Sequence, residues 1–325
     1  MSDSIFVGNP TVAAKMKVML TGSNGFVGRA VAAALEGSGC LVVPVVRRSV
    51  AGGQVAIDNL DGHTDWAEAL RGCEVVVHLA ARAHVMQEEA ADPLAVYSNI
   101  NTAGTLNLAS QAAKSGVRRF VFTSSIKVNG ERTVTGSAFK VDDLPQPEDA
   151  YAVSKHEAEI GLRQIANETG MEVVIIRSPL VYGPGVKGNF SSMMRWLQRG
   201  LPMPLGAATR NFRSLVALDN LVDLITTCIN HPLAANKTFL VSDGEDLSTA
   251  DLLRRLGQAM GKPARLLPVP PALVFACAKL LGRGDMAQRL FGNLQVDISY
   301  TCQTLGWKPP ISVDEGLRRA VREVR

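Results

Sequence analysis

Apolar strands and helical segments alternate along the first 180 residues of the chain. Runs rich in valine, isoleucine and leucine occur at residues 17–21, 41–46, 75–78, 120–123 and 173–176. Segments with the apolar spacing of helices lie between them, at residues 28–35, 67–70, 101–114 and 152–168. Continuous apolar strands linked by helices are typical of a parallel sheet covered on both faces. The pattern therefore predicts a doubly wound, Rossmann-like α/β fold.

The pattern becomes less regular after Pro179, where glycine and proline recur. This change predicts a flexible extension at 1–15, a dinucleotide-binding domain made mainly of 16–180, and a smaller lobe made mainly of 181–325. We expect the lobe to bind the substrate and some of its segments to return to the first domain.

The most apolar stretch spans residues 272–281. It is shorter than the roughly 20 residues that a membrane-spanning helix needs, so we expect either a buried or an interfacial helix there. The first fifteen residues lack a basic region followed by an apolar one, which is the pattern of a secretory signal. We therefore expect a cytoplasmic protein without a membrane span.

Composition adds few constraints on the function. Lysine and arginine number 34 against 30 aspartate and glutamate residues, without a long run of like charge, which argues against a nucleic-acid partner. The five cysteines are far apart and form no C-x-x-C pair. We expect them to be buried in a reducing compartment, with no metal site.

A glycine-rich segment follows the first predicted strand and opens the first helix. It reads Thr21-Gly22-Ser-Asn-Gly25-Phe-Val-Gly28. Glycines there allow a tight turn and a close approach to a pyrophosphate, which the positive end of the helix attracts. A tight turn without a ligand is the alternative, but the strand and helix on either side favour a dinucleotide. The predicted cofactor contacts are Gly22, Asn24, Gly25, Phe26, Val27 and Gly28.

The end of the second strand indicates which dinucleotide is bound. Arg47 and Arg48 stand where an acidic residue would hold a ribose 2′-hydroxyl. Guanidinium groups suit a 2′-phosphate, so NADP(H) is favoured and NAD(H) stays possible, unless both arginines are merely solvated. Further predicted cofactor contacts are Asp58, Asn59 and Leu60 near the adenine and Leu79, Ala80 and Ala81 near a ribose. His78 itself is more typical of a core histidine.

Three residues form the predicted catalytic group. Ser125 ends a strand, and Tyr151 and Lys155 lie four residues apart at the start of a helix, which places them on one face. An ammonium near a phenol is expected to bring the phenol's pKa toward neutrality. Tyr151 is then a proton donor, Lys155 orients the nicotinamide ribose, and Ser125 positions the reacting oxygen.

These motifs together resemble the extended short-chain dehydrogenase/reductases, the NAD-dependent epimerase/dehydratase family, from about Lys17 to the C-terminus. The resemblance is carried, in the family's order, by Thr21-Gly22-Ser-Asn-Gly25-Phe-Val-Gly28, His78-Leu-Ala-Ala81, Asn101-Thr-Ala-Gly104-Thr105, Phe122-Thr-Ser-Ser125, Tyr151-Ala-Val-Ser-Lys155 and Arg177-Ser-Pro-Leu-Val-Tyr-Gly-Pro-Gly185. It implies an NAD(P)-dependent enzyme in which Asn101 supports the proton path. We expect a homodimer.

The C-terminal half resembles the segments that line the uridine and diphosphate site of nucleotide-sugar members. These are Gly188-Asn189-Phe190, Pro204-Leu-Gly206, Arg213-Ser-Leu-Val-Ala-Leu-Asp-Asn220 and Leu305-Gly-Trp307-Lys-Pro309. The resemblance implies that Asn189 approaches the diphosphate or uracil, Leu205 packs on the base and Arg213 pairs with phosphate. A loop cap and a surface charge are the ordinary alternatives for Asn189 and Arg213. Arg82, His84, Lys127 and Arg289 complete the predicted set of contacts to a UDP-sugar.

Departures from the family's patterns narrow the expected reaction. Dehydratases carry an Asp-Glu pair where this chain has Ile126 and Lys127, which argues against dehydration. The family's 4-epimerases carry an acidic residue in place of Arg47 and an asparagine near Leu180. The whole pattern resembles reductases that act on the C4 keto group of UDP-linked N-acetylated 6-deoxyhexoses in O-antigen and lipopolysaccharide biosynthesis.

Three other functions stay open from the sequence. The first is a UDP-hexose or UDP-N-acetylhexosamine 4-epimerase, which would use the same Tyr151 and Lys155. The second is an enzyme acting on a steroid-like or flavonoid-like ketone, against which the phosphate-binding candidates argue. The third is a non-catalytic NADP-binding regulator, since a fold alone does not fix a function.

Overall fold

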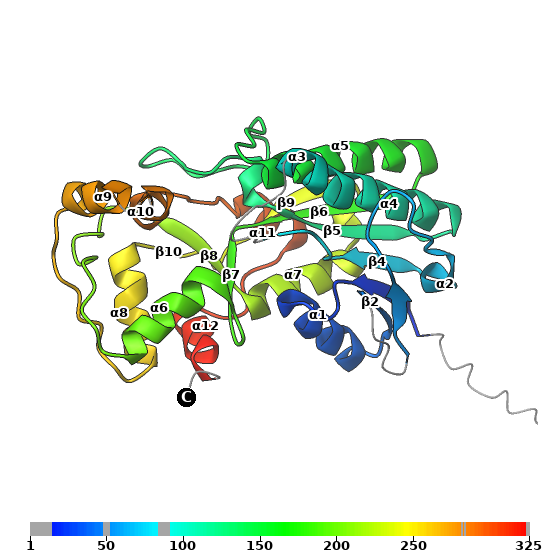
Figure 1. Ribbon diagram of the computed structural model, residues 1–325. Coiled ribbons are helices and arrows are strands. Elements are labelled where there is room, and N and C mark those ends of the chain that lie inside the picture. Colours follow the sequence, from blue (N-terminus) through cyan, green and yellow to red (C-terminus); the bar gives the residue numbers. More distant parts are fainter. Residues whose placement is uncertain (1–14, 48–52, 84–91, 281, 283, 323–325) are drawn as a thin grey trace, which may run out of the picture.

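The computed structural model describes residues 15–47, 53–83, 92–280, 282 and 284–322, and its two lobes are visible in Figure 1. The larger lobe contains a seven-stranded sheet in the order β3-β2-β1-β4-β5-β6-β9, and every neighbouring pair is parallel. Its strands are β1 (Lys17–Thr21), β2 (Leu41–Arg47), β3 (Val55–Ile57), β4 (Val75–His78), β5 (Arg119–Ser125), β6 (Glu172–Ser178) and β9 (Lys237–Leu240). The predicted doubly wound fold is confirmed.

Successive strand residues supply the two cores of this lobe. Val18 and Leu20 of β1 pack into a core with α1 (Phe26–Gly37) and α7 (Leu218–Asn230). Met19, between them, packs on the opposite face with α2 (Ala67–Leu70), α4 (Gly104–Lys114) and α5 (Ala150–Thr169). Side chains alternate along a strand, so a strand that is apolar throughout is buried on both faces.

The segment before α4 is helical over a longer range than the sequence predicts. α3 (Pro93–Tyr97) leads through a π-helical turn (Ser98–Ala103) into α4, where we expected one helix from residue 101. Asp92 caps the N-terminus of α3 by accepting from the Ala95 N–H at 3.0 Å. Two short 3₁₀ turns are also present: Ile126–Val128 follows β5, and Pro232–Ala234 follows α7. A π-helical turn departs from regular α-helical hydrogen bonding, and such turns occur frequently at functional sites.

The smaller lobe forms around a second sheet in the order β10-β8-β7. It comprises β7 (Leu180–Tyr182), β8 (Arg213–Ala217), β10 (Asp246–Leu247), α6 (Gly188–Gln198), α8 (Thr249–Ala259), α9 (Pro271–Leu280), α10 (Gly284–Phe291) and α12 (Val313–Ala320). α7, β9 and α11 (Ser299–Leu305) pack with the larger lobe, so the chain crosses between the lobes more than once. α9 and α10 lie at the far left of Figure 1.

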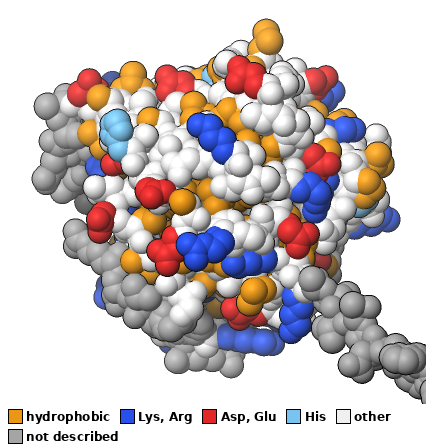
Figure 2. All heavy atoms as spheres, turned by 90° about the vertical axis from the view of Figure 1, so that its right-hand side faces the viewer, with side chains coloured by type: hydrophobic (Ala, Val, Ile, Leu, Met, Phe, Trp, Pro, Cys, Tyr) orange, Lys and Arg blue, Asp and Glu red, His pale blue; other side chains and the backbone are white. Residues whose placement is uncertain are grey.

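Two sequence-based expectations need correction here. No residue of α9 is buried, so the buried alternative for the stretch at 272–281 is wrong over the described residues of that helix. Cys73 and Cys228 are buried as expected, whereas Cys40 and Cys302 are half-buried and Cys277 on α9 is exposed. Among the helices of the described ranges, none has both the length and the apolar character to cross a bilayer. Figure 2 shows positive and negative side chains interspersed on the face it presents.

Candidate active site

Ser125, Tyr151 and Lys155 meet at the carboxyl end of the parallel sheet. α5 begins after Asp149, whose Oδ1 accepts from the Ala152 N–H at 2.7 Å, and this cap fixes the turn that carries Tyr151. The hydroxyls of Tyr151 and Ser125 are hydrogen-bonded. Lys155 Nζ lies 3.9 Å from the centre of the Phe122 ring on β5. The structure thus brings the predicted catalytic group together on two adjoining elements.

Burial dominates the protonation of both titratable groups. It raises the pKa of the Tyr151 phenol to about 12, helped by the Asp149 carboxylate and Tyr97 and opposed by the hydrogen bond with Ser125. It lowers the pKa of Lys155 to about 7, against the attraction of Glu159. The expectation that Lys155 brings the phenol's pKa toward neutrality is wrong for this structure, because desolvation is the largest influence on Tyr151 and it raises the pKa. The resting phenol therefore holds its proton at neutral pH.

A buried ion pair lies one helical turn beyond Lys155. Glu159 is fully buried, and its Oε2 accepts from Arg177 Nη2 of β6 at 2.6 Å. Its Oε1 accepts from Ser124 Oγ at 2.7 Å, immediately before Ser125. Arg177 also donates to Asn129 Oδ1 at 2.9 Å. The pair connects α5, β5 and β6 beneath the predicted catalytic group. The four-residue spacing from Lys155 to Glu159 is a sequence signal that could have placed this carboxylate near Lys155.

The buried ammonium of Lys155 predicts a pH-dependent stability difference. The pKa of Lys155 in the folded protein lies below the ordinary value of 10.5, so between about pH 7 and 10 the unfolded chain binds more protons and stability rises with pH. We expect Lys155→Met to raise Tm by a few degrees near pH 6, with a margin that narrows toward pH 10. Thermal unfolding at both pH values tests this, with Lys114→Met at the exposed end of α4 as the control. A margin that is constant or grows with pH would contradict it.

The turn between β1 and α1 fits a dinucleotide diphosphate. Gly25 is the N-cap of α1 and contributes no side-chain cap, and the first turn of the helix has no acidic residue. The N–H groups in the first turn of this twelve-residue helix are therefore available to an anion. Gly22 has φ +70°, and a Cβ there would lie 2.9 Å from the Ala80 N atom. This close approach places the turn against the residues that follow β4.

A buried histidine joins the two segments of this cofactor cradle. His78 Nδ1 lies 2.7 Å from Thr21 Oγ1, and its Nε2 lies 2.9 Å from Thr105 Oγ1 on α4. Thr21 Oγ1 also accepts from the N–H groups of Leu79 and Ala80, at 3.2 Å each. Burial lowers the pKa of His78 to about 3, so the ring is neutral. His78 thus occupies the core, and its contacts position the cradle.

The other predicted cofactor contacts lie in varied surroundings. Arg47 ends β2 with an exposed side chain, whereas Arg48 lies outside the described residues. Asp58 and Asn59 are exposed after β3, but Leu60 is buried in the core of the larger lobe. The structure therefore leaves Leu60 little surface for a ligand. In the glycine-rich turn and in the segment after β4, Gly28 is buried. The other predicted contacts there are half-buried or exposed, namely Asn24, Gly25, Phe26, Val27, Leu79, Ala80 and Ala81.

Two predicted site residues are tied to protein partners. Lys127 Nζ pairs with Asp149 at 2.5 Å and with Glu131 at 2.6 Å, which holds this ammonium against the cap of the catalytic helix. Asn101 is buried, and its side chain exchanges hydrogen bonds with the backbone of Arg82 and donates to Ser154 Oγ at 3.0 Å. The side chain of Asn101 thus links the loop after β4 to α5.

The remaining predicted substrate contacts lie on both lobes. Arg82 lies over the Tyr97 ring, at 5.6 Å from its centre. Asn189 is exposed in the first turn of α6, and Leu205 is only 7% exposed within the core of the smaller lobe. Arg213 begins β8, where its Nη1 donates to the Gly292 carbonyl at 3.2 Å. His84 and the side chain of Arg289 lie outside the described part of the chain.

Sequence reasoning missed two residues beside the phenol. The Tyr97 ring meets the Tyr151 ring edge-on, with 6.1 Å between centres. Asp149 both caps α5 and pairs with Lys127. An aspartate before a helical segment is an N-cap signal, so Asp149 could have been predicted. No pattern in the sequence indicates Tyr97, because its position depends on the π-helical turn that follows it.

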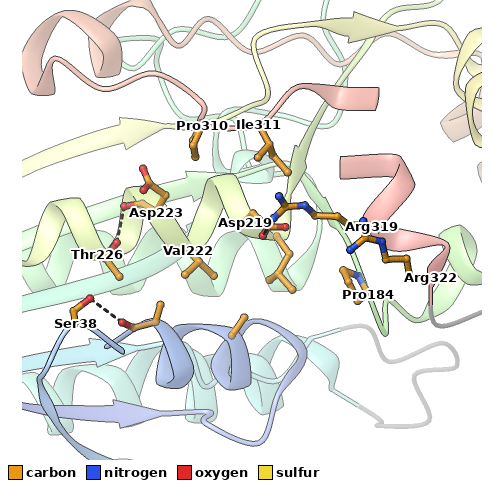
Figure 3. A pocket seen from close by; sticks show the side chains of 13 residues that line it. Ser38, Pro184, Asp219, Val222, Asp223, Thr226, Pro310, Ile311, Arg319 and Arg322 are labelled. Carbon is orange, nitrogen blue, oxygen red and sulfur yellow. Dashed lines mark hydrogen bonds and ion pairs between the residues drawn. The ribbon is translucent and has the colours of Figure 1, made fainter. Parts of the chain in front are cut away.

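A surface pocket of about 800 Å³ lies away from this catalytic group, between α1, α7 and the C-terminal segment (Figure 3). Ala30, Ala34 and Val222 form part of its wall, and the ion pair between Asp219 and Arg319 crosses it at 2.6 Å. None of the predicted catalytic or substrate-binding residues lines it. It is therefore separate from the candidate active site.

Known proteins resemble this chain over most of its length. The model for the NAD dependent epimerase/dehydratase family matches residues 18–242. A protein of Vibrio cholerae described as UDP-glucose 4-epimerase is 51% identical over 309 residues, covering 94% of each chain. The structure of a Thermotoga maritima UDP-glucose 4-epimerase with UDP-glucose superposes with a TM-score of 0.75 at 23% identity, covering 95% of this chain and 99% of the other. RMD from Pseudomonas aeruginosa, complexed with NADPH, superposes with a TM-score of 0.73 at 22% identity, covering 95% and 99%.

Proposed function

The chain belongs to the NAD dependent epimerase/dehydratase family, and from this premise we propose that it is a UDP-hexose or UDP-N-acetylhexosamine 4-epimerase. The observation that carries the proposal is the 51% identity, over 94% of both chains, to the Vibrio cholerae protein described as a UDP-glucose 4-epimerase. The sequence alone favoured a C4 reductase, and this similarity favours the alternative instead.

The proposed chemistry is a proton transfer at the sugar's O4 coupled to oxidation and reduction at C4. The nicotinamide cofactor, when bound, supplies the hydride chemistry. The deprotonated form of Tyr151, which the positive nicotinamide of a bound oxidised cofactor would favour over the protonated form of the resting enzyme, takes the O4 proton and later returns it, and Ser125 holds the same oxygen through its hydroxyl. Lys155 is buried between Phe122 and Glu159, where it orients the nicotinamide ribose. The glycine-rich turn and the N-terminus of α1 hold the diphosphate.

The residues around Ser125 do not favour dehydration. Ile126 is 2% exposed, and Lys127 is paired with two carboxylates. This segment therefore presents no free carboxylate pair of the kind that would act at C5 and C6. We assign contacts with the nucleotide to Asn189, Leu205 and Arg213, and a contact with the sugar to Arg82. Lys127 is assigned no direct contact with the substrate, and its role is to hold the cap of α5 in position.

A C4 reductase is the second candidate because of one observation. Arg47 stands exposed at the end of β2, where an acidic residue would hold the ribose of NAD. An exchangeable NADP(H) suits a reductase, which must release oxidised cofactor in every cycle. An epimerase has no such requirement.

Two incubations separate the candidates. Purified protein supplied with NAD⁺ or NADP⁺ and with UDP-glucose or UDP-N-acetylglucosamine, without added NADPH, is expected to form the corresponding galacto epimer, which nuclear magnetic resonance detects. Incubation with NADPH and a UDP-4-keto-6-deoxy-N-acetylhexosamine measures reduction directly. Loss of NADPH matched mole for mole by formation of the sugar with a hydroxyl at C4, together with no epimer in the first incubation, would overturn the proposal and support the reductase.

Arg47 also predicts a cofactor preference. Its guanidinium can pair with a 2′-phosphate, so we expect NADPH to bind more tightly than NADH, by about tenfold or more. Arg47→Asp should reverse the preference, and Arg71→Asp at the exposed end of α2 should leave it unchanged. Calorimetric titration of both cofactors measures the ratio. Equal affinities in the unsubstituted protein would mean that Arg47 is merely solvated.

A further inference from the structure

α9 exposes an apolar stripe to solvent. Leu273 is 56% exposed and Leu280 is 87% exposed, and Ala276 and Cys277 are exposed between them. These residues recur at intervals of three and four, so they lie along one side of the helix. The solvent side of a helix in a globular protein is ordinarily polar. This stripe and Lys279 beside it are called the α9 surface.

The other side of α9 already has a partner. Val274, Phe275 and Ala278 are half-buried, and the Phe275 ring lies 5.4 Å from the Phe291 ring at the end of α10. α9 is therefore anchored to the small lobe through one side while the α9 surface faces outward. Since α9 and α10 stand at the end of the molecule farthest from the seven-stranded sheet, a flat partner could reach them (Figure 1).

Basic residues outnumber acidic ones in the sequence around α9, although Asp251 and Asp285 flank the segment. From residue 252 to residue 284 the chain contains six basic residues and no acidic one, namely Arg254, Arg255, Lys262, Arg265, Lys279 and Arg283. Some are engaged: Arg255 pairs with Glu245 and Asp314, and Arg254 pairs with Asp251. Lys279 and Arg265 are exposed close to α9 in the sequence. An exposed apolar helix with basic neighbours is typical of segments that lie on anionic membranes.

We propose that the α9 surface docks this protein on an anionic membrane, with the helix lying in the plane of the lipid headgroups. Leu273 and Leu280 enter the apolar boundary, and Lys279 and Arg265 contact lipid phosphates. A second copy of the chain is the alternative occupant, which sedimentation velocity distinguishes from a membrane.

Flotation of the full-length protein with lipid vesicles tests the proposal. We expect binding to vesicles of equal parts phosphatidylglycerol and phosphatidylcholine, and at least about tenfold weaker binding to pure phosphatidylcholine. Leu273→Glu with Leu280→Glu should lower binding by about tenfold or more, and Lys279→Ala by about fivefold. Leu233→Glu, at a leucine 55% exposed on the 3₁₀ turn after α7, is the matched control and should bind normally.

Circular dichroism and Tm show whether the variants remain folded. We expect them to fold, because the substituted side chains are exposed. Absence of vesicle binding by the unsubstituted protein would overturn the proposal. So would equal loss in the Leu233→Glu control. Sedimentation velocity without lipid tests whether a second copy of the chain occupies the α9 surface instead. If the α9 substitutions dissociate an oligomer and leave vesicle binding unchanged, the surface is a contact between copies and the membrane proposal is wrong. None of these measurements depends on turnover.

Discussion

Tyr151→Phe is expected to lower kcat by about 10²- to 10⁴-fold while cofactor affinity stays within about twofold, because the change removes only the hydroxyl that we propose carries the proton. The ring remains in place against Tyr97, and the bond that is lost is the one to Ser125. Steady-state kinetics, together with calorimetric titration of the cofactor, measures both quantities.

Tyr300→Phe is the matched control, because it removes a phenol hydroxyl from α11, where Tyr300 is 38% exposed. It should retain full activity. If Tyr151→Phe keeps more than about a tenth of kcat, Tyr151 is not the proton carrier, since general acid–base catalysis contributes more than that.

Gly28→Ala is expected to weaken cofactor binding by about 5- to 100-fold, the effect of forcing one methyl group into a packed site. A Cβ at Gly28 would lie 2.0 Å from the Gly22 carbonyl oxygen and 2.8 Å from Ser23 Cα. These are backbone atoms of the turn that we propose holds the diphosphate, so the turn itself must move. Calorimetric titration measures the loss.

Gly37→Ala provides the control for this substitution. It lies in the same helix, and a Cβ there meets no atom within 4 Å. We expect unchanged affinity and an equal or slightly higher Tm, because alanine favours the helix more than glycine does. Unchanged cofactor affinity in Gly28→Ala would show that the turn does not hold the cofactor.

The main sheet could be predicted from the sequence because its strands are apolar on both faces. Val75 to Val77 are fully buried, and no amphipathic helix accepts such a run. The smaller lobe was predicted only as a region. Its strands β7 and β10 have three and two residues, too few for a periodic pattern to show. The exposure of α9 also could not be predicted, because an apolar run reads the same whether or not a neighbour covers it.

The site was predictable where chemistry and spacing coincide. Ser125, Tyr151 and Lys155 follow from their positions at a strand end and on one helix face. The pKa values of Tyr151 and Lys155 could not be predicted, because burial determines them and the sequence does not show how deeply a side chain is buried. Lys127 was predicted to contact the substrate, yet it pairs with Glu131 and Asp149. Such pairing depends on tertiary contacts that no local pattern records.

The fate of the hydrogen at C4 tests the central claim most directly. In the proposed 4-epimerisation, the hydrogen that leaves C4 of the sugar returns to C4 of the same molecule from the opposite side. UDP-glucose or UDP-N-acetylglucosamine carrying deuterium at C4, incubated in ordinary water with the purified protein and NAD⁺ or NADP⁺, should therefore give a galacto epimer that retains the deuterium at C4. Mass spectrometry and nuclear magnetic resonance of the product read this out. A galacto product that carries protium at C4, or no epimer from either sugar, would contradict the account.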